Sequence, residues 1–191
     1  MNRQEAQETV TEVFALYEQY GNDDYIGEPV SQMEHMCQAA QMAQAGGYDE
    51  EVILAAFFHD IGHLCEHIMT VGKMDGYGVR DHEILAGNYL RSKGFSGKIA
   101  RLVESHVQAK RYLTYKYPDY YSKLSAASKI TLDKQGGMMT AVEAQLFEQD
   151  DLHTLFIKLR EWDDKAKLQH QPLPPLEKFR EMALHHLLQQ N

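Results

Sequence analysis

The chain has 191 residues, a length that predicts a single domain spanning residues 1–191. Hydrophobic residues make up 43% and charged residues 25%, a balance that is typical of globular proteins and excludes a disordered or fibrous chain. The formal net charge of −9 argues against a nucleic-acid-binding protein or an anionic-membrane binder, because both would require a basic face.

Apolar residues recur at three- and four-residue steps from the start of the chain, which predicts a first helix around residues 10–17. Ser31 and Glu34 have the spacing of a capping box and are expected to open a second helix. Asp49 is the expected cap of a third helix, Glu51–Cys65. This third segment is nearly all apolar, so we expect it to be buried on most sides.

Further helices are expected in the rest of the chain. They cover His82–Lys93, Gly97–Tyr115, Lys123–Leu132, Thr140–Gln149 and Leu152–Lys167, and three prolines introduce a last helix up to about Gln190. The glycine-rich loop over residues 66–81 is expected to be the longest irregular stretch. Because no run of alternating β-branched residues predicts a strand, the sequence predicts an all-α fold.

The chain lacks the sequence features of membrane and secreted proteins. No apolar run reaches the roughly 18 residues of a spanning helix, and the polar start MNRQEAQETV has no signal-peptide core. The two cysteines, Cys37 and Cys65, form neither a disulfide framework nor a C-x-x-C pair. We therefore expect a cytoplasmic protein that does not associate with membranes.

Four histidines are spaced almost evenly along the predicted helices. His35, His59, His82 and His106 are separated by 24, 23 and 24 residues. A helix, a turn and a returning helix take about this length, so the four side chains can lie at a similar height in an antiparallel bundle. Since metal sites in bundles are built from facing helices, the spacing predicts a metal site in the core.

Carboxylates accompany these histidines. Asp60 directly follows His59 in an apolar segment, where two polar side chains are costly to bury unless a partner such as a metal satisfies them. Asp163 lies in a late helix, but composition alone does not distinguish it from the adjacent Asp164. Imidazole and carboxylate ligands without suitably placed thiolates suit iron, zinc, manganese or nickel.

The order of these residues resembles that of a known superfamily. The first histidine, the histidine–aspartate doublet and the late aspartate are similar to the H…HD…D pattern of HD-domain proteins, which are all-α, metal-dependent phosphohydrolases. The additional His82 and His106 resemble the two-metal subgroup, which includes mixed-valent di-iron oxygenases. The resemblance implies an HD-domain helical bundle with a dinuclear metal site in its core.

Longer segments narrow the resemblance to phosphonate-cleaving dioxygenases of the 2-amino-1-hydroxyethylphosphonate type. The matching segments are DDYIGEPVSQMEH, AAFFHDIGHLC, MDGYGVRDHE, ESHVQAKRYL, KLSAAS and QGGMM, and the similarity covers about residues 23–168. It implies oxygen-dependent cleavage of the carbon–phosphorus bond of (R)-2-amino-1-hydroxyethylphosphonate to glycine and phosphate. An upstream hydroxylase would then supply this small-molecule phosphonate.

The resemblance also implies two iron ions in the Fe(II)/Fe(III) state, with dioxygen as co-substrate. Asp60 would bridge the two ions. The remaining ligands would be His35, His59 and Asp163 at one ion and His82 and His106 at the other. This set leaves open positions, as a catalytic metal site requires.

Seven further residues match the family's substrate pocket. Tyr25 would occupy an iron until substrate displaces it, and Glu28 would meet the ammonium group of the substrate. The phosphonate would be bound by His63, Lys110, Ser128, Thr131 and Gln135.

The positions of two of these residues support the pocket independently of the resemblance. His63 lies four residues after His59, and Lys110 lies four residues after His106, so each pair shares one face of a helix. Arg111 lies about 100° further around the helix and is expected to face solvent. Lys110 is therefore the expected cation for a dianionic phosphonate.

Other functions stay open at this point. A related oxygenase would convert the trimethylammonium analogue to glycine betaine, although a quaternary ammonium cannot donate a hydrogen bond to Glu28 and favours an aromatic cage. The same ligands holding zinc, manganese or nickel would suit an oxygen-independent phosphohydrolase. A non-enzymatic sensor or scaffold would leave the buried ligand set unexplained.

Overall fold

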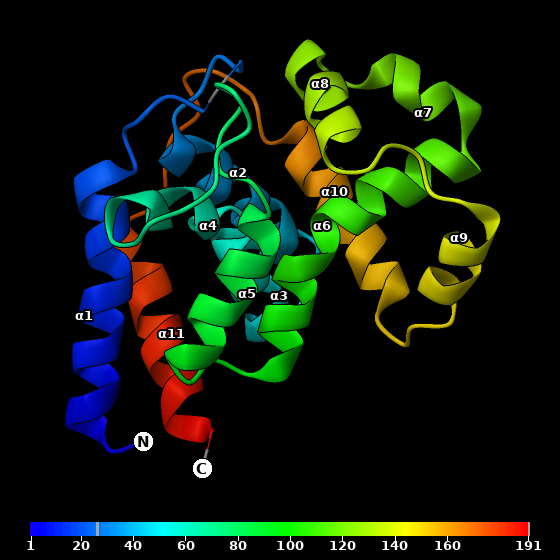
Figure 1. Ribbon diagram of the computed structural model, residues 1–191. Helices are drawn as coiled ribbons and strands as arrows, with labels where there is room; N and C mark the ends of the chain where they lie inside the picture. The colour runs from blue at the N-terminus through cyan, green and yellow to red at the C-terminus, as the bar shows by residue number, and fades with distance from the viewer. Residues whose placement is uncertain (26, 191) are drawn as a thin grey trace.

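The structure is a computed structural model that describes residues 1–25 and 27–190. Its helices are α1 (Arg3–Tyr20), α2 (Gln32–Ala45), α3 (Glu50–Phe58), α4 (Ile61–Leu64), the 3-10 helix η1 (Cys65–His67), α5 (His82–Ser92), α6 (Gly97–Lys116), α7 (Pro118–Lys123), α8 (Ala126–Lys134), α9 (Ala141–Glu148), α10 (His153–Lys165) and α11 (Leu176–Gln189) (Figure 1). The described residues form no strand, only two isolated bridges. None of the described helices is both long and apolar enough to cross a bilayer. The predicted all-α fold is confirmed.

Helix α3 lies at the centre of the bundle, and its side chains from Val52 to Phe58 are all buried. Helices α2, α6 and α11 pack against it. Figure 1 shows α1 beside α11, so the first and last helices together cover one flank of the core. An aromatic stack joins this flank to α3, because the rings of Tyr17 and Phe179 have their centres 4.5 and 4.3 Å from that of Phe57.

The local signals for helix starts are confirmed. Ser31 and Glu34 form both hydrogen bonds of the predicted capping box at the start of α2. At Thr140, where a helix was also expected to begin, Thr140 and Glu143 form a second capping box at the start of α9. The side chain of Asp49 accepts a hydrogen bond of 3.0 Å from the backbone at the start of α3. Local side-chain chemistry therefore accounts for where these three helices begin.

The prediction of one continuous helix over Glu51–Cys65 is wrong. Helix α3 ends at Phe58, α4 begins at Ile61, and Asp60 between them has φ −108° and ψ 11°. Neighbouring side chains in an unbroken helix point about 100° apart, so a continuous helix would aim His59 and Asp60 in different directions. The break instead brings His59 Nε2 within 3.5 Å of Asp60 Oδ2, and both side chains face the interior.

A second difference concerns the helix expected over Lys123–Leu132. The corresponding helix, α8, starts later because Ser125 caps it, accepting a hydrogen bond of 3.1 Å from the backbone of Ser128. A short additional helix, α7, precedes it and begins with Pro118, a residue that fits the first position of a helix because no backbone donor is needed there. Helix α8 supplies part of the lining of the cavity described below.

Candidate metal centre and substrate pocket

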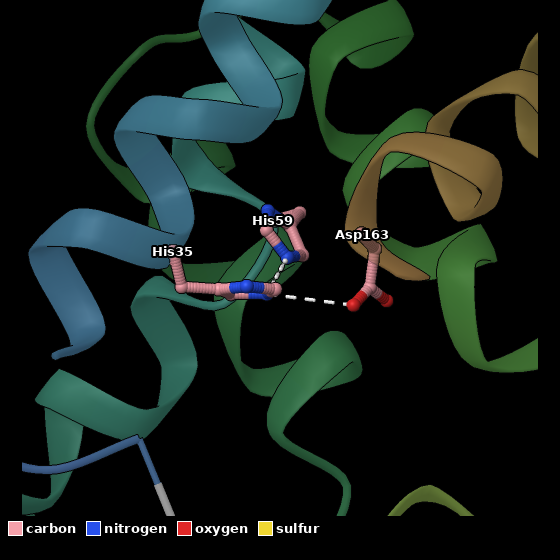
Figure 2. A group of neighbouring side chains, drawn as sticks. All are labelled: His35, His59 and Asp163. Atoms are coloured by element: carbon pink, nitrogen blue, oxygen red, sulfur yellow. Dashed lines mark hydrogen bonds and ion pairs between the residues drawn. The ribbon is translucent and has the colours of Figure 1, made fainter. Parts of the chain in front are cut away.

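Five parts of the chain present the six predicted metal ligands to one buried cluster. They are His35 on α2, His59 and Asp60 at the break between α3 and α4, His82 at the start of α5, His106 on α6 and Asp163 on α10. Each of the six is at most 5% exposed. Figure 2 shows His35, His59 and Asp163 pointing toward one another from three separate elements. Residues far apart in the sequence therefore form one compact set of donor atoms.

Four of these residues form a first group of donor atoms. His35 Nε2 lies 2.9 Å from His59 Nε2 and 3.4 Å from Asp163 Oδ1. The same nitrogen lies 3.4 Å from Asp60 Oδ2. His35, His59 and Asp163 have donor atoms close enough to one another to bind a single ion.

The other oxygen of Asp60 faces a second group. His82 Nε2 and His106 Nε2 are 3.0 Å apart, and each lies 3.3 Å from Asp60 Oδ1. His63 is close to this group as well. Its ring stacks on that of His82 with centres 4.1 Å apart, and one of its ring nitrogens lies within 4.8 Å of a carboxylate oxygen of Asp60. Asp60 thus presents one carboxylate oxygen to each group, as a bridging ligand would.

Hydrogen bonds determine which ring nitrogens are available as ligands. His35 Nδ1 lies 2.9 Å from the Ala166 carbonyl oxygen, and His59 Nδ1 and His106 Nδ1 make equivalent bonds of 2.9 and 2.8 Å to backbone carbonyls. A carbonyl only accepts, so each Nδ1 carries a proton, and in the neutral imidazole each Nε2 then has the lone pair that a metal ion would bind. His35 Nε2 and His59 Nε2 lie 2.9 Å apart, a contact that either a shared proton or a bound metal ion would satisfy.

The charge states of the cluster also fit metal binding. Burial lowers the pKa of His59 to about 4, so its imidazole is neutral at pH 7. Although burial alone would raise it, the neighbouring histidines hold the pKa of Asp60 well below its ordinary value. Asp60 Oδ1 is buried and has no hydrogen-bond partner among the described residues. Although burial alone would lower it, the Asp163 and Asp60 carboxylates raise the pKa of His35 to about 9, so this histidine would lose a proton when a metal ion binds.

The structure distinguishes the two adjacent aspartates of α10. Asp163 faces His35, whereas Asp164 is directed to Arg160 and to the hydroxyl of Tyr120, which donates a hydrogen bond of 2.5 Å to it. Arg160 also donates to Asp163 Oδ2 at 2.7 Å and is 4% exposed. Arg160 lies three and four residues before the two aspartates, so the sequence spacing alone could have predicted these ion pairs on one face of the helix.

All seven predicted substrate residues line one cavity beside the second ligand group. These are Tyr25, Glu28, His63, Lys110, Ser128, Thr131 and Gln135, and the cavity also reaches Asp60, His82, His106 and Asp163. Lys110 is 2% exposed and donates a hydrogen bond of 2.9 Å to Thr131 Oγ1. Burial lowers the pKa of Lys110 to about 7. The cavity therefore combines a candidate metal pair with a buried amine and neutral hydroxyl groups.

The chain is similar to known proteins along most of its length. No protein-family model matches it. It is 43% identical to an uncharacterised protein, L432, of Acanthamoeba polyphaga mimivirus, over 97% of this chain and 85% of that protein. It is 38% identical to [1-hydroxy-2-(trimethylamino)ethyl]phosphonate dioxygenase (glycine-betaine-forming) of Leisingera caerulea, over 80% of this chain and 76% of the relative. It is 37% identical to hydroxymethylphosphonate dioxygenase of Gimesia maris, over 90% of this chain and 85% of the relative.

The chain belongs to the phosphonate dioxygenase family. It is therefore an oxygenase enzyme of all-α architecture, and its cluster of histidines and aspartates is compatible with the metal that such enzymes use. The two named relatives have different substrates in their names, so family membership alone does not identify the phosphonate on which this chain acts.

In this phosphonate dioxygenase, Tyr25 and Glu28 lie at the mouth of the ligand cluster. The ring of Tyr25 stacks on His35 with centres 4.0 Å apart and planes 14° from parallel. Burial, together with the Asp60 and Asp163 carboxylates, raises the pKa of the Tyr25 phenol well above its ordinary value. Glu28 accepts a hydrogen bond of 2.5 Å from Ser125, in a position from which it faces the same cavity.

Two features of the site differ from, or were missing in, the sequence prediction. Arg111 was expected to face solvent, and this prediction is wrong. It is largely covered and donates to the Gly137 carbonyl at 2.9 Å and to Glu143 at 2.7 Å, because the loop after α8 folds back over α6. Glu83 was not predicted, but it is 6% exposed and its Oε2 lies 3.6 Å from His82 Nδ1. Sequence spacing does not identify Glu83 as a neighbour of the His82 ring, because adjacent residues on a helix usually point in directions about 100° apart.

Proposed function

We propose that the enzyme cleaves the carbon–phosphorus bond of (R)-2-amino-1-hydroxyethylphosphonate with dioxygen to give glycine and phosphate. The observation that carries the proposal is Asp60, whose two oxygens face two groups of histidines beside a cavity with a buried lysine. Two irons in the Fe(II)/Fe(III) state would occupy the two groups, with His35, His59 and Asp163 at one and His82 and His106 at the other. When bound, they would supply the activation of dioxygen.

The reaction balances without an external reductant. One C–P bond breaks, C1 is oxidised from an alcohol to a carboxylate, and dioxygen is reduced, with one oxygen atom required for glycine and one for phosphate. Hydrolysis does not readily achieve this cleavage, because a C–P bond lacks the oxygen leaving group of a phosphate ester. An oxygenase therefore fits a phosphonate substrate better than a phosphohydrolase does.

The pocket residues would hold the two charged ends of this substrate. Lys110 is the proposed partner of the phosphonate, because a dianion beside a buried amine favours the protonated amine and a charge-assisted hydrogen bond. His63, Ser128, Thr131 and Gln135 would complete the phosphonate contacts. Glu28 would accept a hydrogen bond from the ammonium group, which favours a primary amine over a trimethylammonium group. The substrate carbon C1 would then lie between these ends, facing the ligand cluster.

The wider setting follows from the same chemistry. The hydroxyl group at C1 of the substrate implies a preceding hydroxylation reaction. Cys37 and Cys65 are both buried and free, and burial raises the pKa of each thiol to about 12. Unreactive thiols without a disulfide fit the cytoplasm that we propose for the enzyme.

The decisive experiment measures oxygen uptake by the iron-loaded enzyme with (R)-2-amino-1-hydroxyethylphosphonate while glycine and phosphate are quantified. We expect equal amounts of glycine and phosphate, and none when oxygen is removed. Phosphate release that continues without oxygen would refute the proposal in favour of a phosphohydrolase. Oxygen uptake only with the trimethylammonium analogue would refute the proposed substrate but retain the oxygenase.

A further inference from the structure

The carboxylate proposed to meet the substrate's ammonium group already has an ammonium partner within the chain. Lys167 Nζ lies 2.7 Å from Glu28 Oε1, the oxygen that also accepts the hydrogen bond from Ser125. The side chains of Lys167 and Glu28 are 14% and 9% exposed, so water screens this ion pair only weakly. A residue 139 positions away in sequence thus pairs with the cavity-lining carboxylate that is proposed to meet the substrate amine.

The segment that carries Lys167 does not depend on this ion pair for its position. On one side of Lys167, the Ala166 carbonyl accepts a hydrogen bond of 2.9 Å from His35. On the other side, Leu168 exchanges two backbone hydrogen bonds of 2.9 and 3.0 Å with the side-chain amide of Gln38. Both neighbours are anchored to α2, so the backbone at Lys167 is held without help from Glu28.

A second partner for Lys167 lies toward the phosphonate end of the cavity. Its Nζ is 3.5 Å from Ser128 Oγ, and Ser128 lines the cavity as Lys110 does. The ammonium of Lys167 therefore has a hydroxyl group within reach if another cation takes its place on Glu28. Its movement would keep a positive charge close to a bound dianion.

We propose that Lys167 is a specificity-determining residue that allows the enzyme to accept 1-hydroxyphosphonates both with and without an amine. This inference rests on the proposed function. A substrate ammonium has the same chemistry as the Lys167 side chain and replaces it on Glu28. A substrate without an amine leaves the ion pair intact, so the carboxylate stays neutralised beside the dianionic phosphonate. Without Lys167, Glu28 would repel an amine-free substrate and bind an ammonium without competition.

The amine-free reaction balances in the same way. For hydroxymethylphosphonate, the C–P bond breaks, the carbon is oxidised to formate, and dioxygen supplies one oxygen atom to formate and one to phosphate. No oxidant other than dioxygen and no external reductant is needed. The wild-type enzyme is therefore expected to consume oxygen with either substrate.

The test compares the wild type with Lys167→Met, using kcat/KM for (R)-2-amino-1-hydroxyethylphosphonate and for hydroxymethylphosphonate. We expect Lys167→Met to lower KM for the amine substrate and raise KM for the amine-free one, so the ratio of the two kcat/KM values changes by about tenfold or more. Lys167→Arg should retain the wild-type ratio, because it retains the cation. Lys165→Met, at an exposed lysine two residues earlier, is the matched control and should change neither value.

Two kinetic results overturn the inference. One is a ratio in Lys167→Met within twofold of the wild type, including the case in which both KM values rise equally, as for a merely structural ion pair. The other is a wild-type enzyme that turns over only the amine substrate. Calorimetric binding of 2-aminoethylphosphonate and ethylphosphonate, neither of which has the reacting hydroxyl, separates this inference from the proposed function. A selectivity change in binding without any oxygen uptake would leave the role of Lys167 standing and refute the oxygenase reaction, whereas no change in binding selectivity would refute the role of Lys167.

Discussion

Lys110 is expected to destabilise the folded enzyme while it serves substrate binding. Its side chain is 2% exposed, and the partner to which it donates is the neutral hydroxyl of Thr131. No carboxylate among the described residues lies within ion-pair distance of it. The replacement Lys110→Met keeps a side chain of similar length and removes the buried charge. We therefore expect this variant to be more stable than the wild type and to have a higher KM for phosphonates.

The magnitude follows from the pKa. Burial lowers the pKa of Lys110 from 10.5 to about 7, and since one pKa unit corresponds to about 1.4 kcal/mol, the buried charge costs about 5 kcal/mol at low pH. At pH 7 roughly half of the folded molecules have a neutral lysine, which leaves a cost of about 4 kcal/mol. Loss of the hydrogen bond to Thr131 offsets about 1 kcal/mol of the gain. Lys110→Met should thus raise the free energy of unfolding by about 3 kcal/mol at pH 7.

The sign of the pH dependence is fixed by the lowered pKa. Between pH 7 and 10.5 the unfolded chain binds a proton at Lys110 that the folded chain has released, so the stability of the wild type rises with pH relative to the variant. The advantage of Lys110→Met should shrink to about 1 kcal/mol or less by pH 10. Urea unfolding of the wild type and of Lys110→Met at pH 7 and pH 10, with equal metal content in both proteins, measures this difference in stability.

The control is Lys116→Met, which removes an exposed lysine from the same helix. Lys116 makes a surface ion pair with Glu148, and such an exposed pair contributes little to stability, so this variant should unfold as the wild type does at both pH values. The reasoning is refuted if the stability difference between Lys110→Met and the wild type is the same at pH 7 and pH 10. It is also refuted if Lys110→Met is the less stable protein at pH 7.

Two further predictions concern the ligand cluster. Tyr25→Phe should retain the two proposed irons but react with oxygen before substrate is added, because the phenol that stacks on His35 is lost. Stopped-flow oxygen consumption and metal analysis test this. Loss of both metal ions would make Tyr25 a structural residue instead. Glu83→Gln should weaken metal binding about tenfold, because the carboxylate 3.6 Å from His82 Nδ1 raises the basicity of that ring. Metal titration with a competing chelator measures the change, and an unaltered dissociation constant would exclude this role for Glu83.

Much of the helical framework could be predicted from sequence because its signals are local. The capping boxes at Ser31 and Thr140 depend on side chains three residues apart, and both are present in the structure. The regular histidine spacing predicted a buried cluster for a similar reason, since a helix and its return have a nearly constant length. The break at His59–Asp60 was not predictable from periodicity, because an all-apolar segment has the same pattern whether or not it is interrupted.

The parts of the site that escaped prediction depend on contacts between distant segments. Lys167 pairs with Glu28 across 139 residues, and neither residue has a local neighbour that suggests the other. Arg111 was assigned to solvent from its angle on the helix, but the loop after α8 covers that face and supplies Gly137 as an acceptor. Helix geometry determines the direction of a side chain, whereas the tertiary fold determines what lies in that direction.

The distribution of positive charge at the pocket supports a single role for each buried cation. A chain with a net charge of −9 that binds a dianion has to gather its cations locally. Arg160 is committed to Asp163 and Asp164, and Lys167 to Glu28, so both charges are already balanced by carboxylates. Lys110 alone of these three is held by a neutral hydroxyl. A dianionic phosphonate could therefore pair with Lys110 without displacing it from a carboxylate, which is not so for the other two cations. The free-energy cost of burying the Lys110 charge is offset only when the substrate binds.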